Sequence, residues 1–233
     1  MATKQVKLPE IGLVTFYKRR GSRSIRLSIA RDGSLRVTLP PWVPYRAGLD
    51  FVRSKINWIN AQQRSAQKPL INGQAIGKAH HLYLQEDSMA QKIKGHLRGS
   101  EAIVVLPLGL TPESTEVQKA ARAICIRALR KESEQLLPKR LAELAKIHEF
   151  TFNKITIRQL KSRWGSCNQH HDITLNLFLI QLPWSLIDYV LLHELTHTKV
   201  LHHGPVFWKE FETHTPDARK LQREIRTYQP TLL

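Results

Sequence analysis

The sequence predicts an α+β protein in which a histidine-bearing helix lies beside a small sheet and follows a β-rich lobe. Alternating apolar and polar residues over 14–39 are typical of strands. Apolar residues at helical spacing recur over 111–148 and again over 184–201. Because no internal repeat or long linker separates these segments, we expect a lobe with one helix over residues 1–110 and a second domain over residues 111–233, packed as one body.

Length, cysteine usage and charge restrict the class of protein. A chain of 233 residues can bury a substantial core, so a metal would not be needed merely to hold it folded. Two cysteines without a CxxC pair argue against a disulfide framework and indicate a reducing environment. With no signal-like start and no run of 18 uncharged apolar residues, we expect a cytoplasmic protein that does not span a membrane.

The charge balance is strongly basic. Lys and Arg number 36 against 19 Asp and Glu, which gives a formal net charge of +17. Such an excess favours contact with polyanions, and nucleic acid is therefore a possible partner. The composition leaves the oligomeric state open.

The lobe is expected to begin with strands. Asp32-Gly33 separates the runs IRLSIA and LRVTLP, and a two-residue Asp-Gly connection is typical of a β-hairpin. A cluster of prolines then ends the alternation, and apolar residues at helical spacing over 45–63 predict an amphipathic helix packed on the sheet. Glycines interrupt the apolar runs within residues 80–107, and we therefore expect short strands there.

A long helix is expected to open the second domain. Thr111 and Pro112 resemble a helix start, with the threonine as the N-cap and the proline in the first turn. Apolar periodicity continues to about His148, and Pro138 is expected to bend or divide the helix.

Two strands and a final helix follow. Residues 152–160 and 173–180 have strand-like composition and flank a polar, turn-rich segment. The second strand is placed to line a cleft, where a free edge could align an extended peptide, although a plain core strand is the simpler interpretation. Asn176 either faces that cleft or satisfies local backbone groups. Pro183 ends the strand and opens a strongly apolar helix.

That helix contains the motif HExxH, formed by His193, Glu194 and His197. Residues four apart project from one helix face, so two neutral imidazoles can reach one zinc ion. The surrounding residues are apolar, and burying this set without a partner would cost several kcal/mol. A bound metal removes that cost, and the motif therefore predicts a zinc site in which Glu194 acts on the metal's water.

Catalytic zinc usually takes three protein ligands and leaves one position for water. We expect His203 to be the third ligand, because Gly204-Pro205 can turn the chain back towards the helix. The rival candidates are His202, Glu210, Glu212 and His214.

With three neutral ligands, zinc keeps its double charge and lowers the pKa of its water towards about 7. Glu194 would take the proton of that water and pass it to the leaving group. A nearby cation would stabilise the developing oxyanion, and Arg163 is the candidate, although an ordinary solvated or ion-paired side chain explains it equally well.

The segments RQLKSRWGSCN, ITLNLFLIQLP, YVLLHELTH and HHGPVFW follow one another in this order, after N-terminal text that includes DGSLRVTLP. Together these linked motifs resemble the YgjP-like metallopeptidase domain family, a relative of the SprT-like and WLM zinc domains. The resemblance implies a zincin-like catalytic core in which His193, His197 and His203 bind zinc and Glu194 is the base.

The resemblance leaves the substrate open. Hydrolysis of a peptide bond is the leading expectation. The alternative is a metal-dependent hydrolase of nucleoside triphosphates such as UTP, although the chain has no Walker P-loop. A third possibility is a nucleic-acid-associated protein, or a protease of DNA-bound proteins as SprT-like relatives suggest.

Overall fold

The computed structural model describes residues 3–9, 11–29, 34–59 and 69–232. The chain forms two compact units, Met1–Lys68 and Pro69–Leu233. Helices and small sheets occur together, so the fold class is α+β as predicted. The division into units lies at residues 68 and 69, whereas the sequence suggested residues 110 and 111.

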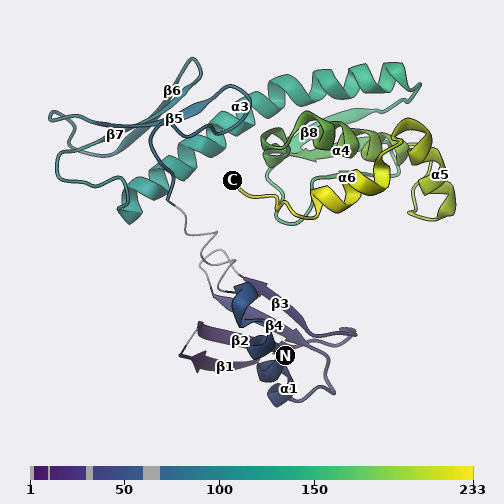
Figure 1. Cartoon of the computed structure of the whole chain (residues 1–233), viewed down its shortest axis with the longest axis horizontal. Helices are drawn as coiled ribbons and strands as arrows, with labels where there is room; N and C mark the ends of the chain where they lie inside the picture. The colour runs from purple at the N-terminus through teal and green to yellow at the C-terminus, as the bar shows by residue number, and fades with distance from the viewer. Residues whose placement is uncertain (1–2, 10, 30–33, 60–68, 233) are drawn as a thin grey trace. The chain divides into compact units, whose positions relative to one another are not determined.

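The smaller unit is a four-stranded sheet with a helix on one face (Figure 1). Its strands lie in the order β1-β2-β4-β3. Their bounds are β1 Thr3–Leu8, β2 Gly12–Lys18, β3 Arg26–Ile29 and β4 Leu35–Leu39. β3 and β4 are antiparallel, as the hairpin prediction requires, while the predicted turn at Asp32-Gly33 lies outside the described residues. β1 was not predicted, because four of its six residues are polar and none of its side chains is buried.

The helix of this unit is α1, Tyr45–Ser54. It packs its buried residues Gly48 and Val52 against the sheet, where Leu39 and Phe16 approach Gly48 so closely that a Cβ there would lie 3.0–3.1 Å from them. α1 ends earlier than the helix expected over 45–63, and the last four residues of that range lie outside the described residues.

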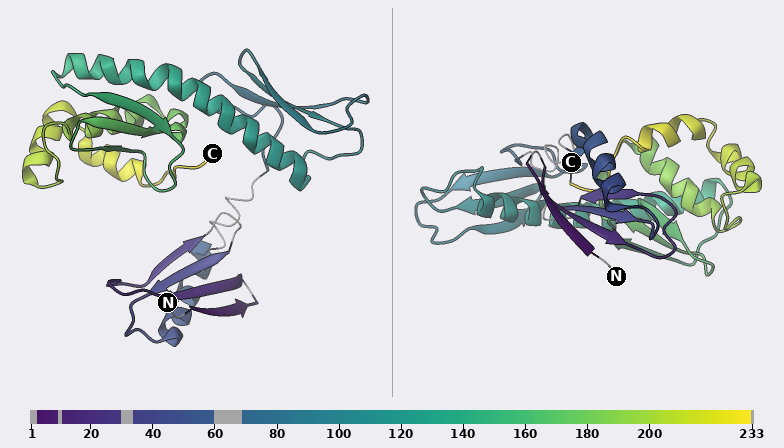
Figure 2. Two further views of the ribbon diagram at one scale, coloured as in Figure 1. Left: turned by 180° about the vertical axis from the view of Figure 1, so that it is seen from behind. Right: turned by 90° about the horizontal axis from the view of Figure 1, so that it is seen from below.

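The larger unit begins with a three-stranded sheet and a long helix that packs on it (Figures 1 and 2). The strands, in the order β5-β7-β6, are β5 His81–Glu86, β6 Lys94–Arg98 and β7 Glu101–Leu106. The helix, α3, runs over Thr115–Ile147. Because α3 also packs against the second sheet of this unit, it joins the predicted lobe residues 81–106 to the histidine-bearing part of the chain.

α3 differs from its prediction at two points. It begins at Thr115 and not after Thr111, because residues 111–114 form a separate turn in which the Ser114 amide donates to the Thr111 carbonyl at 3.1 Å. Pro138 lies inside the helix without dividing it. A proline removes one amide donor, and buried Leu137 and Leu141 hold the helix in place on either side.

The second sheet carries β8 Lys154–Arg158, β10 Asp172–Asn176 and β9 Gly165–Cys167, in the order β8-β10-β9. β9 falls in the segment that was expected to be a polar turn. The strand predicted over 173–180 ends at Asn176, and Leu177–Gln181 forms the 3₁₀ helix η1. Asn176 causes this change, since its side-chain oxygen accepts the Phe178 amide at 3.2 Å and caps η1.

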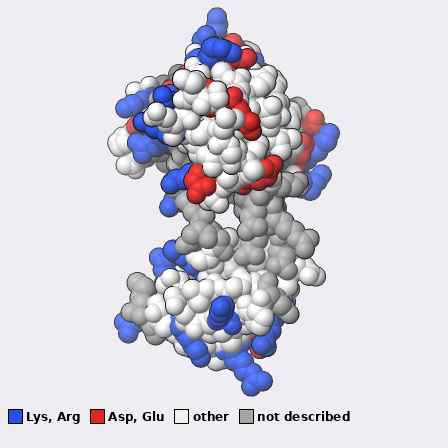
Figure 3. All heavy atoms as spheres, turned by 90° about the vertical axis from the view of Figure 1, so that its left-hand side faces the viewer, with Lys and Arg blue, Asp and Glu red and all other residues white. Residues whose placement is uncertain are grey.

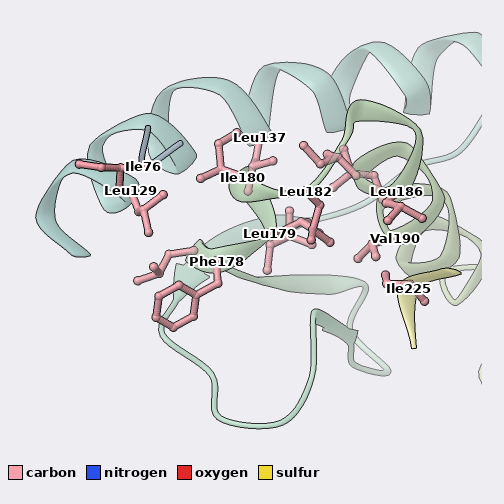
Figure 4. Packing of buried hydrophobic residues seen from close by; sticks show 14 of the residues in the cluster. Ile76, Leu129, Leu137, Phe178, Leu179, Ile180, Leu182, Leu186, Val190 and Ile225 are labelled. Atoms are coloured by element: carbon pink, nitrogen blue, oxygen red, sulfur yellow. The ribbon is translucent and has the colours of Figure 1, made fainter. Parts of the chain in front are cut away.

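Three further helices complete the unit, α4 Trp184–Thr196, α5 Pro205–His214 and α6 Ala218–Ile225. α4 stops at Thr196, five residues before the predicted end. η1, α3, α4 and α6 contribute side chains to one continuous core, part of which Figure 4 shows around Leu137, Ile180 and Leu186. In the described part of the chain, no helix combines the length and the apolar character that a membrane crossing needs.

A buried carboxylate ties α3 to the loop before β5. Glu132 is 3% exposed and accepts hydrogen bonds from the Lys78, Ala79 and His80 amides at 2.5, 3.0 and 2.8 Å. The His80 ring nitrogen Nδ1 lies 2.6 Å from the same carboxylate. Burial alone would raise the pKa of Glu132, but these hydrogen bonds outweigh burial and hold the pKa below its usual value.

Replacing Glu132 with glutamine is expected to lower the free energy of unfolding by about 2–4 kcal/mol at pH 7, because the amide cannot satisfy all of these buried donors. A lowered folded-state pKa stabilises the fold above the unfolded pKa, and this contribution is lost as the pH falls. The difference from wild type should therefore shrink below about pH 4.5. Urea unfolding at pH 7 and pH 4 measures both effects. Exposed Glu134→Gln is the control, and equal losses in the two variants would contradict the prediction.

Candidate metal centre

Three histidine rings converge at the C-terminal end of α4. His193 lies in the last turn of the helix, His197 is its C-cap, and His203 lies in the following loop. Their Nε2 atoms are 3.3 Å (His193 to His197), 3.1 Å (His197 to His203) and 2.9 Å (His203 to His193) apart. The predicted three residues are thus brought together with one nitrogen of each ring facing a common point.

The donor set fits a divalent metal ion such as zinc. The His197 Nδ1 atom lies 3.1 Å from the Val200 carbonyl oxygen, which favours a proton on Nδ1 and leaves the Nε2 lone pair facing the other rings. The buried Nδ1 atom of His193 has no hydrogen-bond partner among the described residues. An interaction that offsets the cost of burying this ring therefore has to be made by its Nε2 atom. Tetrahedral zinc with nitrogens at about 2.0–2.1 Å separates them by about 3.3 Å, close to the spacings found here.

Burial favours the neutral form of the His193 and His197 rings. Desolvation, with smaller contributions from His197 and His203, lowers the pKa of His193 to about 3. Burial also lowers the pKa of His197, while the Val200 and Leu201 backbone partially opposes this shift. A metal binds the neutral form of imidazole, so these two rings do not have to lose a proton at neutral pH before they can take up an ion.

Phe207 supports all three rings and was not anticipated from the sequence. It is fully buried in α5, and its ring centroid lies 4.9, 4.6 and 4.7 Å from those of His193, His197 and His203. The signal in the sequence was the apolar spacing of Phe207 and Phe211 after Gly204-Pro205, which begins α5 directly behind the third histidine.

The rival ligands lie elsewhere and have other partners. His202 is exposed and is absent from the converging group. Glu210 pairs with Lys199 at 3.0 Å and with His214 at 3.3 Å. Glu212 pairs with Arg219 at 2.8 Å.

Glu194 is buried beside the histidines and packs against the backbone of β9. It is 5% exposed, and a Cβ on Gly165 would lie 2.6 Å from its Oε1 atom and 2.9 Å from its Cδ atom. Gly165 therefore leaves the space that the carboxyl group occupies, a role that the sequence did not reveal. Burial raises the pKa of Glu194 to about 8, and the positive charge of Arg163 opposes this rise.

The loop before β9 is held by Asn176. Its Nδ2 atom donates to the Leu160 and Arg163 carbonyl oxygens at 2.9 and 2.8 Å, and its own amide donates to the Trp164 carbonyl at 2.8 Å. Of the two interpretations left open, Asn176 thus satisfies local backbone and is fully buried. It also positions the segment that carries Arg163 and Gly165 next to Glu194.

The sheet presents a different edge from the one expected. β10 lies between β8 and β9, so the proposed free edge of residues 173–180 is wrong for its strand part. β9 is an edge strand among the described residues, and it is also the strand that contacts Glu194. β9 is short and contains a glycine, so no alternation of apolar and polar residues predicts this strand.

A hollow of about 530 Å³ lies beside His203. Its lining residues are His203, Gly204, Pro205, Trp208, Lys209, Glu212 and Arg219. The Arg219 guanidinium stacks 4.0 Å from the centroid of the Trp208 ring, which gives the hollow one aromatic and cationic wall.

One comparison with known proteins identifies the family of this chain. A family model described as YgjP-like, metallopeptidase domain, matches residues 23–228. Among solved structures, the chain is similar to the crystal structure of the metallopeptidase zymogen of Pyrococcus abyssi abylysin. The sequence identity is 25%, the match covers 42% of this chain and 100% of that chain, and the TM-score is 0.37. No curated protein matches the chain.

Proposed function

Because this chain belongs to the YgjP-like metallopeptidase domain family, we propose that it is a zinc-dependent peptidase in which His193, His197 and His203 hold the ion and Glu194 is the general base. The observation that carries the proposal is the convergence of three Nε2 atoms within 2.9–3.3 Å of one another. Two of these atoms come from one helix face, and the third comes from a loop six residues later.

When bound, the ion supplies Lewis-acid chemistry, which polarises a carbonyl group and makes water a stronger acid. The chain supplies the proton transfers. The positive charge of a bound ion would hold Glu194 in its carboxylate form, whose oxygen accepts the proton of the attacking water and then delivers it to the leaving nitrogen. Burial of Glu194 against Gly165 fixes the position of its carboxyl group and excludes bulk water from it. Arg163 remains the candidate for stabilising the oxyanion.

An extended peptide can be aligned by the β9 edge. Backbone groups of Gly165 to Cys167 that do not face β10 are available for main-chain hydrogen bonds. Such pairing recognises the backbone and not the side chains, so it supports a peptide over a nucleotide as substrate. The hollow beside His203 offers room for one substrate side chain.

The test is turnover of a mixed peptide library by the zinc-loaded protein. Mass spectrometry of the products should detect new termini that disappear with a chelator and return when zinc is restored. A nucleotide panel that includes UTP, followed by pyrophosphate release, is run in parallel. A protein that contains a full equivalent of zinc and cleaves no peptide would overturn the proposal, and nucleotide turnover alone would replace it with the alternative hydrolase.

Gly165→Ala is expected to lower kcat/KM for the peptide substrate by about 100-fold, because the new methyl group displaces the Glu194 carboxyl group. Zinc content should stay at one equivalent, since no metal-binding residue is changed. Gly95→Ala is the matched control, because an added Cβ there makes only an ordinary contact, 3.5 Å from Ile124 Cβ, and Gly95 lines no proposed site. Similar activity in both variants would show that the Gly165 contact does not position the base.

A further inference from the structure

The charge of the protein is concentrated in its smaller unit. Residues 1–68 contain 14 Lys and Arg against three Asp and Glu, a formal excess of +11 out of +17 for the whole chain. The larger unit therefore holds only +6 over 165 residues. On the face shown in Figure 3, the charged residues of the smaller unit are nearly all Lys and Arg, whereas those of the larger unit are of both signs. The site of hydrolysis does not account for this charge.

One face of the four-stranded sheet is open. Val14, Phe16, Leu35, Val37 and Leu39 are buried in the core that α1 covers. Side chains alternate along a strand, so the residues between them face the opposite side of the sheet. In β2 and β4 these are Leu13, Thr15, Tyr17, Arg36 and Thr38, of which Thr15 is buried.

The strand register aligns this open face into two polar rows. One row is Gln5, Thr15, Arg36 and Ser28. The other is Thr3, Tyr17, Thr38 and Arg26. A contact of 3.5 Å from Gln5 Nε2 to Thr15 Oγ1 agrees with this alignment. Hydroxyl, amide and guanidinium groups make up these rows together with one phenol ring, and neither row contains a carboxylate.

The cations of this face lack acidic partners among the described residues. Arg26 and Arg36 are exposed, and neither makes an ion pair there. The described acidic residue of the unit is Asp50, which lies on α1 and pairs with Arg53 at 3.7 Å. The loop between β2 and β3 adds the exposed Arg19, Arg20 and Arg23 at the end of the sheet where Tyr17 and Arg26 lie.

We propose that this open sheet face binds single-stranded nucleic acid. Unpaired guanidinium groups match the phosphate backbone, hydroxyl and amide groups can contact sugars and base edges, and the Tyr17 ring can stack on a base. A face of four strands is wider than the helix or two-stranded ribbon that enters the major groove of a duplex, so unpaired strands fit better. Leu13, 45% exposed, is the one aliphatic residue among the described strand residues of this face, and a single side chain is too little apolar surface to anchor the face in a membrane.

The test compares charge-matched variants of the full chain. Fluorescence anisotropy measures binding of labelled 20-nucleotide oligo(dT) and oligo(rU), a 20-base-pair duplex, and vesicles with anionic lipid. In Arg26→Ser/Arg36→Ser, single-strand affinity should fall about tenfold or more, and the slope of log affinity against log salt should fall by about 1–2. The oligo(dT) and oligo(rU) arms distinguish DNA from RNA.

Arg46→Ser/Arg53→Ser is the control, because it removes the same charge from α1 on the covered side. It should bind within about threefold of wild type. Equal weakening in both double variants, equal affinity for the duplex, or binding to vesicles alone would overturn the proposal. Tyr17→Leu, which keeps an apolar side chain, should also weaken binding while thermal melting stays unchanged. Glu194→Gln should bind like wild type, so a failed peptidase assay does not affect this result.

Discussion

Glu194→Gln is expected to reduce peptide turnover by about 10²–10⁴-fold while the protein keeps its metal. The two side chains have the same shape, so the amide fits the space beside Gly165. An amide cannot accept the proton of the attacking water, and the chemical step loses its base. Because Glu194 is 5% exposed, bulk water cannot easily replace it in that role.

Single-turnover kinetics on the best library peptide, together with zinc analysis of the same sample, measure this effect. The matched control is Glu143→Gln, an exposed carboxylate on α3 that pairs with Arg140 and lies in no proposed site. The control should keep wild-type activity. Loss of zinc from the Glu194 variant, or retention of full turnover, would contradict the assignment of Glu194 as the base.

His203→Ala is expected to weaken zinc binding by more than about 100-fold, since ligand loss costs at least as much as loss of a residue that orients a ligand. His203 is exposed in a loop, so its removal leaves the core of the unit intact. The two remaining imidazoles on α4 cannot complete a three-nitrogen site.

Competition with a chelator of known affinity gives the dissociation constant. An independent reading is the rise in Tm on adding zinc, which should be large in wild type and small in the variant. His202→Ala is the control one residue away, because that ring is not in the converging group. If His202→Ala loses as much affinity as His203→Ala, the third ligand is assigned to the wrong residue.

The sequence predicted elements best where one local pattern decided the outcome. The pairing of β3 with β4, the strands over 81–106 and α4 all follow from alternation or helical spacing within a short window. Prediction from the sequence failed where a contact between residues far apart in the chain determines the local structure. Pro138 does not divide α3, because the core packs both sides of that turn.

The strand predicted over 173–180 illustrates the same limit. Its apolar run reads equally well as a strand or as a buried helical turn. The side chain of Asn176 decides between them, since it binds the Leu160 and Arg163 carbonyls on one side and the Phe178 amide on the other. Those partners are 13 to 16 residues away or just beyond the strand, and no periodicity encodes them.

By itself, the sequence determined the α+β class and the pairing of His193 with His197, because residues four apart on a helix share one face whatever surrounds them. The tertiary structure decided that the His203 ring turns back to those two, that Gly165 makes room for Glu194, and that β9 and not β10 forms the sheet edge. These contacts join residues from separate elements, so they depend on packing in three dimensions that a pattern along the chain does not record.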